Sequence, residues 1–331
     1  MKIAVIGATG LVGQQMVKVL EEERFPVTRL IPVASERSVG QTVNFQNKAW
    51  EVVNIDTALA LQPDITLFSA GGTIAQAHAP AFAEAGSYVI DNSSAFRMKE
   101  DIPLVVPEVN GEVMSADQHI IANPNCSTIQ LVMVLPVIER LFGIERVIIS
   151  TYQSVTGTGY KAVQQMNEER QGQQASDPAY PYPIDLNCIP QCDVFLEEGF
   201  TKEELKLVHE TRKIMGLPNL AISATAVRIP TVGGHSESVN VDCTRVPDVK
   251  LLQQALQETP GVVVMDNPDQ LEYPMPAMAR HKNEVFVGRM RRDLSHTNGL
   301  HLWIVADNLR KGAATNSVQI AKWIWQKGWV K

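Results

Sequence analysis

Residues 2–22, KIAVIGATGLVGQQMVKVLEE, carry the pattern that decides the fold of this chain. An apolar run leads directly into glycines at positions 7, 10 and 13, and a segment with helical character follows. Gly7 permits a tight turn, Gly10 lets backbone N–H groups approach a pyrophosphate, and Gly13 allows the helix to pack closely on the strand. The helix N-terminus then faces the phosphates. The stretch predicts a dinucleotide site, with an ordinary glycine-rich turn as the alternative, because GxxGxxG is less specific than GxGxxG.

The next segments continue the alternation of strands and helices. Short apolar runs at 28–35, 64–70 and 87–93 read as strands, and the alanine-rich stretch 75–86 reads as a helix. Alternation of this kind is typical of parallel βαβ units. We therefore predict an α/β fold whose N-terminal Rossmann-type domain covers residues 1–125. The amphipathic segment 312–331 is expected to return as a helix that completes this domain.

The pattern of predicted strands and helices changes after residue 125, and a second domain is predicted over residues 126–311. Long strand candidates follow one another with few helices between them, which favours an α+β domain with a mixed, largely antiparallel sheet. Residues 127–142 are expected to form one long apolar helix, kinked by Pro136. The segment 166–193 is rich in Gln, Pro and Asp, and we expect an exposed excursion or a contact arm in an oligomer.

Composition narrows the classes of function. The net charge is −7 over 331 residues, whereas a nucleic-acid-binding protein usually has a basic excess. No apolar run approaches the length of a membrane span, and the N-terminal run lacks a signal-peptide pattern, so a soluble cytoplasmic protein is expected. The four cysteines are few and irregularly spaced, which argues against a disulfide framework. Cys188 and Cys192 have no second Cys/His pair for zinc, so we interpret them as structural thiols and predict no metal.

The end of the second predicted strand, ASERSVG, indicates which dinucleotide is preferred. An NAD site usually places an acidic residue here to bind the ribose 2′-hydroxyl, and Glu36 is available for this. Arg37 stands between Glu36 and Ser38, with Ser35 one residue earlier, and a guanidinium beside hydroxyl groups suits a 2′-phosphate better. We therefore favour NADP; the alternative is that Arg37 is a solvated loop charge.

Cys126 is the strongest candidate nucleophile. It lies in ANPNCSTIQ, between a strand end and a helix start, where the partial positive charge of the helix N-terminus favours the thiolate. The same N–H groups could hold an oxyanion. Among the seven histidines, His235 is the best-placed base because a Gly-Gly turn precedes it. A buried structural thiol and a structural histidine are the alternatives.

Eight segments, taken together, resemble aspartate-semialdehyde dehydrogenase. They occur in the family's order and span essentially the whole chain; the segments PNCST, RIPTVGGHSES and DNLRKGAATN are the specific ones, and the glycine loop alone is not. The eight segments are GATGLVG (7–13), SAGG (69–72), DNSSAFR (91–97), PNCST (124–128), TYQSVTGTG (151–159), TKEELK (201–206), RIPTVGGHSES (228–238) and DNLRKGAATNSVQIA (307–321).

The resemblance implies catalytic roles for three residues. Cys126 is similar to the family's nucleophile, His235 to its acid/base and Gln153 to the residue that orients the substrate carbonyl. The resemblance also implies cofactor contacts, with NADP, by Gly7, Thr9, Gly10, Leu11, Val12, Gly13, Ser35, Arg37, Ser38, Gly157 and Asn316.

Four charged residues are similar to residues of the family's substrate site. Arg228 would clamp the substrate carboxylate with two parallel hydrogen bonds. Glu203 would bind the α-amino group, and Arg97 and Lys206 would bind the phosphate. Glu203 and Lys206 are three residues apart, so a helix would place them on one face.

The implied reaction is the reversible, NADPH-dependent reduction of L-4-aspartyl phosphate to aspartate 4-semialdehyde through a thioester on Cys126. The resemblance places this reaction in the biosynthesis of lysine, diaminopimelate, methionine and threonine. It also implies that the protein is a homodimer or a dimer of dimers. One rival is N-acetyl-gamma-glutamyl-phosphate reductase, but its substrate lacks the ammonium that Glu203 would read. A second rival is a noncatalytic NADP-binding homologue, which would be expected to lose Cys126 or His235.

Overall fold

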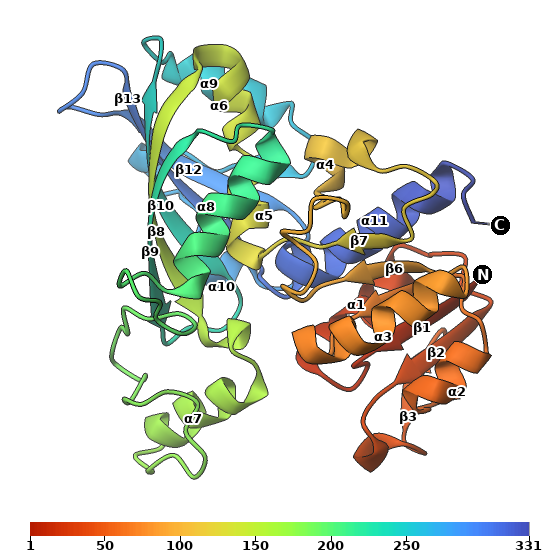
Figure 1. Ribbon diagram of the computed structural model, residues 1–331. Helices are drawn as coiled ribbons and strands as arrows, with labels where there is room; N and C mark the ends of the chain where they lie inside the picture. Colours follow the sequence, from red (N-terminus) through yellow and green to blue (C-terminus); the bar gives the residue numbers. More distant parts are fainter. Residues whose placement is uncertain (331) are drawn as a thin grey trace. The chain divides into compact units, whose positions relative to one another are not determined.

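The computed structural model describes residues 1–330, and the described chain divides into two compact units. The first unit comprises Met1–Asn125 together with Ala313–Lys331, and the second comprises Cys126–Gly312. Figure 1 labels the elements of both. No helix within residues 1–330 combines the length and apolar character needed to cross a membrane.

The first unit is built on a five-stranded parallel sheet in the order β2-β1-β5-β6-β7. Its strands are β1 (Lys2–Ile6), β2 (Arg29–Val33), β5 (Ile65–Phe68), β6 (Tyr88–Asp91) and β7 (Ile120–Ala122), and a separate hairpin is formed by β3 (Thr42–Phe45) and β4 (Lys48–Glu51). Its helices are α1 (Leu11–Glu22), η1 (Glu36–Ser38), α2 (Ile55–Ala60), α3 (Gly72–Glu84), α4 (Pro107–Asn110), η2 (Gly111–Val113) and α11 (Thr315–Gln326).

The C-terminal helix α11 belongs to the core of the first unit, although it is far from that unit's other elements in sequence. Val318 and Ile324 of α11 are buried in one cluster with Met16 and Leu20 of α1. Lys322 of α11 also forms an ion pair with Glu23, with Nζ and Oε2 2.7 Å apart. The apolar face of α11 thus supplies buried surface that the first unit would otherwise lack.

The second unit is built on a six-stranded mixed sheet in the order β11-β12-β13-β10-β8-β9, with three antiparallel and two parallel pairings. Its strands are β8 (Ile144–Ser154), β9 (Ala221–Ile229), β10 (His235–Cys243), β11 (Val262–Val264), β12 (Val285–Arg292) and β13 (Gly299–Ala306). Its helices are α5 (Cys126–Val132), α6 (Leu135–Phe142), η3 (Val155–Gly157), α7 (Tyr160–Arg170), α8 (Lys202–Met215), α9 (Val249–Gln257), η4 (Pro268–Gln270) and α10 (Pro276–Ala279), and the π-helical turn η5 (Arg310–Ala314) links the two units.

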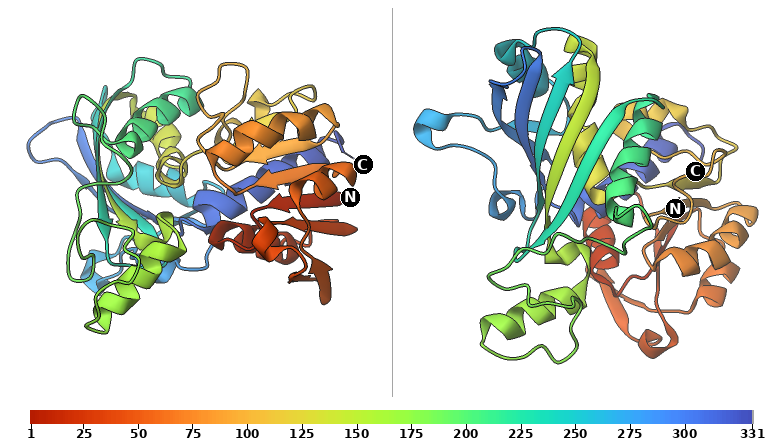
Figure 2. Two further views of the ribbon diagram at one scale, coloured as in Figure 1. Left: turned by 60° about the horizontal axis from the view of Figure 1, so that its bottom comes forward. Right: turned by 60° about the vertical axis from the view of Figure 1, so that its left-hand side comes forward.

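Helices α5 and α8 contact each other and pack against strands β9, β10 and β13 of this sheet. Figures 1 and 2 show α8 lying along one side of the sheet beside α5. The predicted fold class is confirmed: a Rossmann-type parallel sheet and a mixed, largely antiparallel sheet. The arrangement brings side chains from α5, α8, β8, β9 and β10 to a common region, where the candidate site lies.

One prediction about the second unit needs correction. Residues 126–142 form two helices, α5 and α6, with a turn at Met133 and Val134. Pro136 lies at the start of α6, because a proline lacks the N–H that an uninterrupted helix would require there. The segment 166–193 begins within α7 and is mostly exposed, in agreement with the expected excursion, while Ile184 and Ile189 are buried against Val155 and Met166.

Candidate functional site

The glycine loop borders a cleft of about 560 Å³ in the first unit. Gly7 has a φ of 85°, and a Cβ there would lie 2.8 Å from the Ser69 carbonyl oxygen. A Cβ on Gly13 would collide with the Gly7 carbonyl oxygen. Only glycine fits at these two positions, and the loop leads into the N-terminus of α1 beside the cleft, as a pyrophosphate cradle requires.

Four of the predicted cofactor residues line this cleft. The complete wall consists of Ile6, Gly7, Thr9, Gly10, Val33, Ala34, Ser35, Glu36, Asn54, Ile55, Ser69, Ala70, Ile74 and His78. Leu11, Val12 and Gly13 open helix α1 directly after the loop.

The residues that were expected to distinguish NADP from NAD do not all line the cleft. Ser35 and Glu36 lie on the cleft wall, whereas Arg37 and Ser38 follow in η1 outside it, and Arg37 is exposed. The other two predicted cofactor residues lie elsewhere. Asn316 is buried in the first unit, where its Nδ2 donates to Val105 O at 2.9 Å and to Asn123 Oδ1 at 2.7 Å.

Cys126 is the first residue of α5 and is partly buried. Gly312 packs directly on it, since a Cβ at that position would lie 2.8 Å from the Cys126 Cβ. The neighbouring Ser127 accepts a hydrogen bond from Gln153 Nε2 at 3.2 Å, so the start of α5 is joined to the predicted carbonyl-orienting residue. The second unit therefore brings Cys126 and Gln153 together.

The backbone of Ser154, at the end of β8, holds two predicted site residues. Its N–H donates to Nδ1 of His235 at 2.9 Å, and its carbonyl oxygen accepts from Nη1 of Arg228 at 2.7 Å. Gly157 packs against both side chains, because a Cβ there would lie 2.9 Å from Arg228 Nη1 and 3.1 Å from His235 Nε2. Within residues 1–330, neither His235 Nε2 nor Arg228 Nε has a hydrogen-bond partner, although both are buried.

A network of hydrogen bonds and ion pairs connects Gln153 to helix α8, and within it Glu203 is buried, Lys206 is half-buried and Asp193 is exposed. Glu203 Oε1 accepts from Gln153 Nε2 at 3.2 Å, and its Oε2 lies 3.1 Å from Lys206 Nζ. The Lys206 ammonium also contacts Asp193 Oδ2 at 2.8 Å. Burial lowers the pKa of Lys206, but the carboxylates of Glu203 and Asp193 outweigh that effect and raise the pKa above its usual value. Two carboxylates thus surround one ammonium.

Arg97 belongs to the first unit and lies beside the turn that precedes Cys126. Its Nε donates to the Asn123 carbonyl oxygen and its Nη2 to the Asn92 carbonyl oxygen, both at 2.9 Å. The guanidinium therefore braces the loops that follow β6 and β7. The side chain is 7% exposed.

Sequence reasoning missed three residues that position this site. Ser154 orients His235 and Arg228 through its backbone, Gly312 leaves room for Cys126, and Asp193 pairs with Lys206. The TYQSVTGTG and DNLRKGAATN motifs contain the first two, but neither motif shows which residue its backbone contacts. Asp193 gave no signal, because it lies in an irregular segment.

Glu237 is a second buried acid close to the site. It is fully buried on β10, two residues after His235 on the same face of the strand, and neither carboxylate oxygen has a hydrogen-bond partner within residues 1–330. Burial raises the pKa of Glu237 well above its usual value, and this effect is larger than the opposing effect of the nearby Gln130 amide. Burial thus disfavours the ionised form of this carboxyl group.

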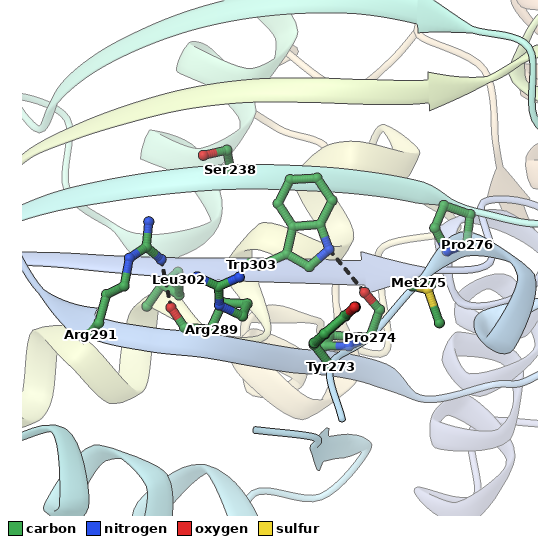
Figure 3. Close-up of a pocket in the computed structure, with 9 residues that line it drawn as sticks. All are labelled: Ser238, Tyr273, Pro274, Met275, Pro276, Arg289, Arg291, Leu302 and Trp303. Atoms are coloured by element: carbon green, nitrogen blue, oxygen red, sulfur yellow. Dashed lines mark hydrogen bonds between the residues drawn. The ribbon is translucent and has the colours of Figure 1, made fainter. Parts of the chain in front are cut away.

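A smaller cavity, of about 280 Å³, lies among Ser238, Trp303, Pro274 and neighbouring residues (Figure 3). Trp303 Nε1 donates to the Pro274 carbonyl oxygen at 3.0 Å, and this bond fixes the indole. Ser238 alternates with Glu237 along β10, so it points away from the face that carries His235. This cavity therefore does not belong to the candidate site.

As a chemical assembly, the second unit combines a thiol, a neutral imidazole, a guanidinium with an unpartnered Nε, and a carboxylate. A guanidinium edge binds a carboxylate, and Glu203 suits an ammonium. A thiol nucleophile beside hydrogen-bond donors suits acyl transfer through a covalent intermediate. Within residues 1–330, no group of three or more His, Cys, Asp or Glu residues is placed to hold a metal ion.

Comparison with known proteins agrees with this geometry. Residues 2–116 match the family model of the semialdehyde dehydrogenase NAD binding domain, and residues 134–311 match that of the semialdehyde dehydrogenase dimerisation domain. The chain is 48% identical to the aspartate-semialdehyde dehydrogenase of Aquifex aeolicus, over 99% of this chain and 98% of that protein. It is also 48% identical to the Bacillus subtilis enzyme, over 97% of this chain and 96% of that protein.

A solved structure supports the same conclusion. Aspartate semialdehyde dehydrogenase II from Vibrio cholerae, complexed with ASA, matches with a TM-score of 0.94 and 44% identity, covering 98% of each chain. Similarity in sequence and structure therefore extends over both units. The resemblance found in the sequence is confirmed, and the chain belongs to the aspartate-semialdehyde dehydrogenase family.

Proposed function

We propose that this protein catalyses the reversible, NADPH-dependent reduction of L-4-aspartyl phosphate to aspartate 4-semialdehyde and phosphate, through a thioester on Cys126. One observation carries the proposal: Gln153, Glu203, Arg228 and His235 form one connected cluster with the start of the helix that bears Cys126. This cluster supplies groups for the carboxylate, the ammonium and the carbonyl of an aspartyl substrate.

Each residue has a defined part in the reaction. Arg228 binds the substrate carboxylate through the edge that includes its unpartnered Nε. Glu203 accepts hydrogen bonds from the α-ammonium, and its buried carboxylate is oriented by Gln153 and Lys206. Cys126 attacks the acyl carbon, and Gln153 orients the carbonyl group.

Arg97 and Lys206 are proposed as the phosphate-binding residues. Both are cations, and a phosphate that leaves the acyl group needs its charge neutralised. Lys206 already contacts Asp193, so the charge it offers to phosphate is reduced. The rival N-acetyl-glutamyl phosphate has no ammonium for Glu203 to bind, and the relatives named above also favour the aspartyl substrate.

The first unit is proposed to bind NADP at the glycine cleft, and when bound the reduced nicotinamide supplies the hydride. Ser35 on the wall, with Arg37 and Ser38 beside it, supports recognition of a 2′-phosphate. Glu36 on the same wall is the observation that favours NAD. Rates measured with the two dinucleotides at equal concentration separate these possibilities.

The second unit is proposed to form a homodimer through the sheet face that carries Tyr152. Ile148 and Tyr152 are partly exposed on β8, and the Tyr152 ring contacts Trp303 with ring centroids 5.4 Å apart. Aromatic side chains at a solvent-facing sheet surface are typical of protein interfaces. The match of residues 134–311 to a dimerisation domain supports this assignment.

The test is reduction of NADP by purified protein with aspartate semialdehyde, with and without inorganic phosphate. We expect turnover that requires phosphate and disappears in Cys126→Ser, because a serine hydroxyl is hardly ionised at neutral pH. N-acetylglutamate semialdehyde serves as the control substrate and should react far more slowly. A preference for that aldehyde, or no phosphate dependence, would overturn the proposal.

A further inference from the structure

Glu237 of β10 and Gln130 of α5 are buried polar side chains on two elements that pack against each other. Within residues 1–330, neither carboxyl oxygen of Glu237 and neither amide atom of Gln130 has a hydrogen-bond partner. The Gln130 amide is nevertheless close enough to Glu237 to lower the pKa of that carboxyl group. Two groups of complementary chemistry therefore lie together in the interior of the second unit, where a polar group without a partner is costly.

Among the described residues, the side chains beside Glu237 offer no cation to a carboxylate. Glu237 is paired across the sheet with Thr151 of β8 and Ile304 of β13, and both of these side chains are uncharged. His235 lies two residues earlier on the same face of β10, and its pKa is lowered to about 3 by burial and then by the Arg228 guanidinium. A carboxylate at Glu237 would therefore be buried without a counter-charge, which favours the protonated form.

Gln130 belongs to the short helix that carries the proposed nucleophile. Helix α5 has seven residues, and Gln130 follows Cys126 by about one turn. A helix of this length is not stable by itself, so its position depends on contacts with the rest of the second unit. One such contact is the hydrogen bond from Gln153 Nε2 to Ser127 Oγ, which ties the first turn to β8. A contact between Gln130 and Glu237 would tie the same helix to β10.

We infer that Glu237 is a neutral carboxylic acid that pairs with the Gln130 amide, and that this pair positions the helix that carries Cys126. A carboxylic acid and an amide each have a donor and an acceptor, so the two groups can satisfy each other reciprocally. The neutral form also favours the thiolate, because a buried carboxylate packed against α5 would oppose a second negative charge at the start of that helix. Glu237 is a positioning residue, and its part in catalysis rests on the proposed function.

The test compares Glu237→Gln, which is neutral and can still pair with an amide, with Glu237→Met, which has a similar size but no strong hydrogen-bonding group. The readouts are kcat and the rate at which iodoacetamide alkylates Cys126 as a function of pH, because alkylation follows the thiolate. We expect Glu237→Gln to resemble the parent, and Glu237→Met to lose about ten- to a hundredfold in kcat with little change in KM, since small misplacements of reacting groups cost up to about 10² in rate. Alkylation of Cys126 should slow in Glu237→Met, whereas that of the exposed Cys188 should not change.

Two results would overturn the inference: equal losses in Glu237→Gln and Glu237→Met, or parent-like alkylation of Cys126 in Glu237→Met. Alkylation needs no turnover. The positioning of Cys126 is therefore tested even if the proposed function is wrong, and a parent that does not turn over aspartate semialdehyde would count against the proposed function alone.

Two further measurements do not depend on the folding of Glu237→Met. Gln130→Glu places two acids opposite each other, and combining it with Glu237→Gln restores one acid and one amide in exchanged positions. We expect Cys126 to be alkylated faster in the double variant than in Gln130→Glu alone, and a double variant that is no faster would contradict the pairing. The infrared difference spectrum between the parent and Glu237→Gln at neutral pH should show the carbonyl stretch of a protonated carboxyl group in the parent. Absence of that band would show that Glu237 is ionised and would overturn the inference.

Discussion

At the scale of single residues, the site depends on groups whose chemistry is set by their immediate neighbours. Arg228 has one nitrogen committed to the Ser154 carbonyl oxygen, while its Nε has no partner within residues 1–330. The guanidinium is therefore held in place before a carboxylate arrives. Preorganisation of this kind reduces the entropic cost of binding.

Replacing Arg228 by Lys tests whether the guanidinium binds the substrate carboxylate through two parallel hydrogen bonds. Lysine keeps the charge but cannot form two parallel hydrogen bonds while also reaching the Ser154 carbonyl. We expect kcat/KM for aspartate semialdehyde to fall about ten- to a hundredfold, the equivalent of one lost charged hydrogen bond, with an unchanged melting temperature. The exposed Arg29→Lys is the matched control. Wild-type kinetics in Arg228→Lys would remove Arg228 from the site.

Glu237 links the site to the pH dependence of stability. Its pKa is raised in the folded chain, so the folded state binds the Glu237 proton more tightly than the unfolded state does. The contribution of this group is fully present below its unfolded pKa of about 4.3 and is lost as the pH rises toward the folded pKa. Glu237→Gln removes this dependence while it conserves size.

We therefore expect the stability of Glu237→Gln, relative to the parent, to increase as the pH rises from about 5 to 8, the neutral range above the usual glutamate pKa. Urea unfolding of both proteins at several pH values measures this difference. Glu51→Gln, at an exposed position, should show no such trend. A constant difference between Glu237→Gln and the parent would mean that Glu237 is ionised in the folded protein.

At the scale of elements, the irregular segment between α7 and α8 contributes to the site. Ile189 pairs with Arg228 through two backbone hydrogen bonds, 2.9 Å and 2.8 Å long. Four residues later, Asp193 reaches Lys206 of α8. The segment therefore brings a carboxylate to the ammonium proposed to bind phosphate.

Asp193→Asn should strengthen phosphate binding. Of the two carboxylates described above that contact Lys206, removing that of Asp193 leaves only that of Glu203. The Lys206 ammonium then attracts the phosphate dianion more strongly. We expect the KM for phosphate to fall about two- to fivefold, the size expected for a partly exposed ion pair, with little change in kcat. Exposed Asp177→Asn is the control. A higher KM would indicate that Asp193 positions Lys206 for phosphate.

At the scale of the whole molecule, features that depend on local sequence were predicted better than features that depend on contacts between distant residues. The glycine loop and the alternation of strands and helices follow from local sequence, and the proposal of Cys126 and His235 as site residues also rests on their flanking residues. The break between α5 and α6 was missed because an apolar run with one proline fits either a kinked helix or two helices. Ser154, Gly312 and Asp193 act through contacts with residues distant in sequence, which no single motif displays.

The proposed dimer is also a property of the whole molecule. Tyr152→Asp would place a charge on the sheet face that carries Trp303, and burying an unpaired charge is costly. We expect light scattering to show half the mass of the parent in this variant. Tyr160→Asp, at a position 70% exposed on α7, should leave the mass unchanged. A monomeric parent, or an unaltered Tyr152→Asp, would contradict the assignment.

The covalent role of Cys126 is the central claim, and it is tested by trapping the acyl-enzyme. The protein is incubated with aspartate semialdehyde and NADP in the absence of phosphate, quenched in acid, digested and analysed by mass spectrometry. We predict an aspartyl thioester on the peptide that contains Cys126, and its disappearance when phosphate is added before quenching. A trapped acyl group on Cys188, Cys192 or Cys243, or turnover without any adduct on Cys126, would contradict the account.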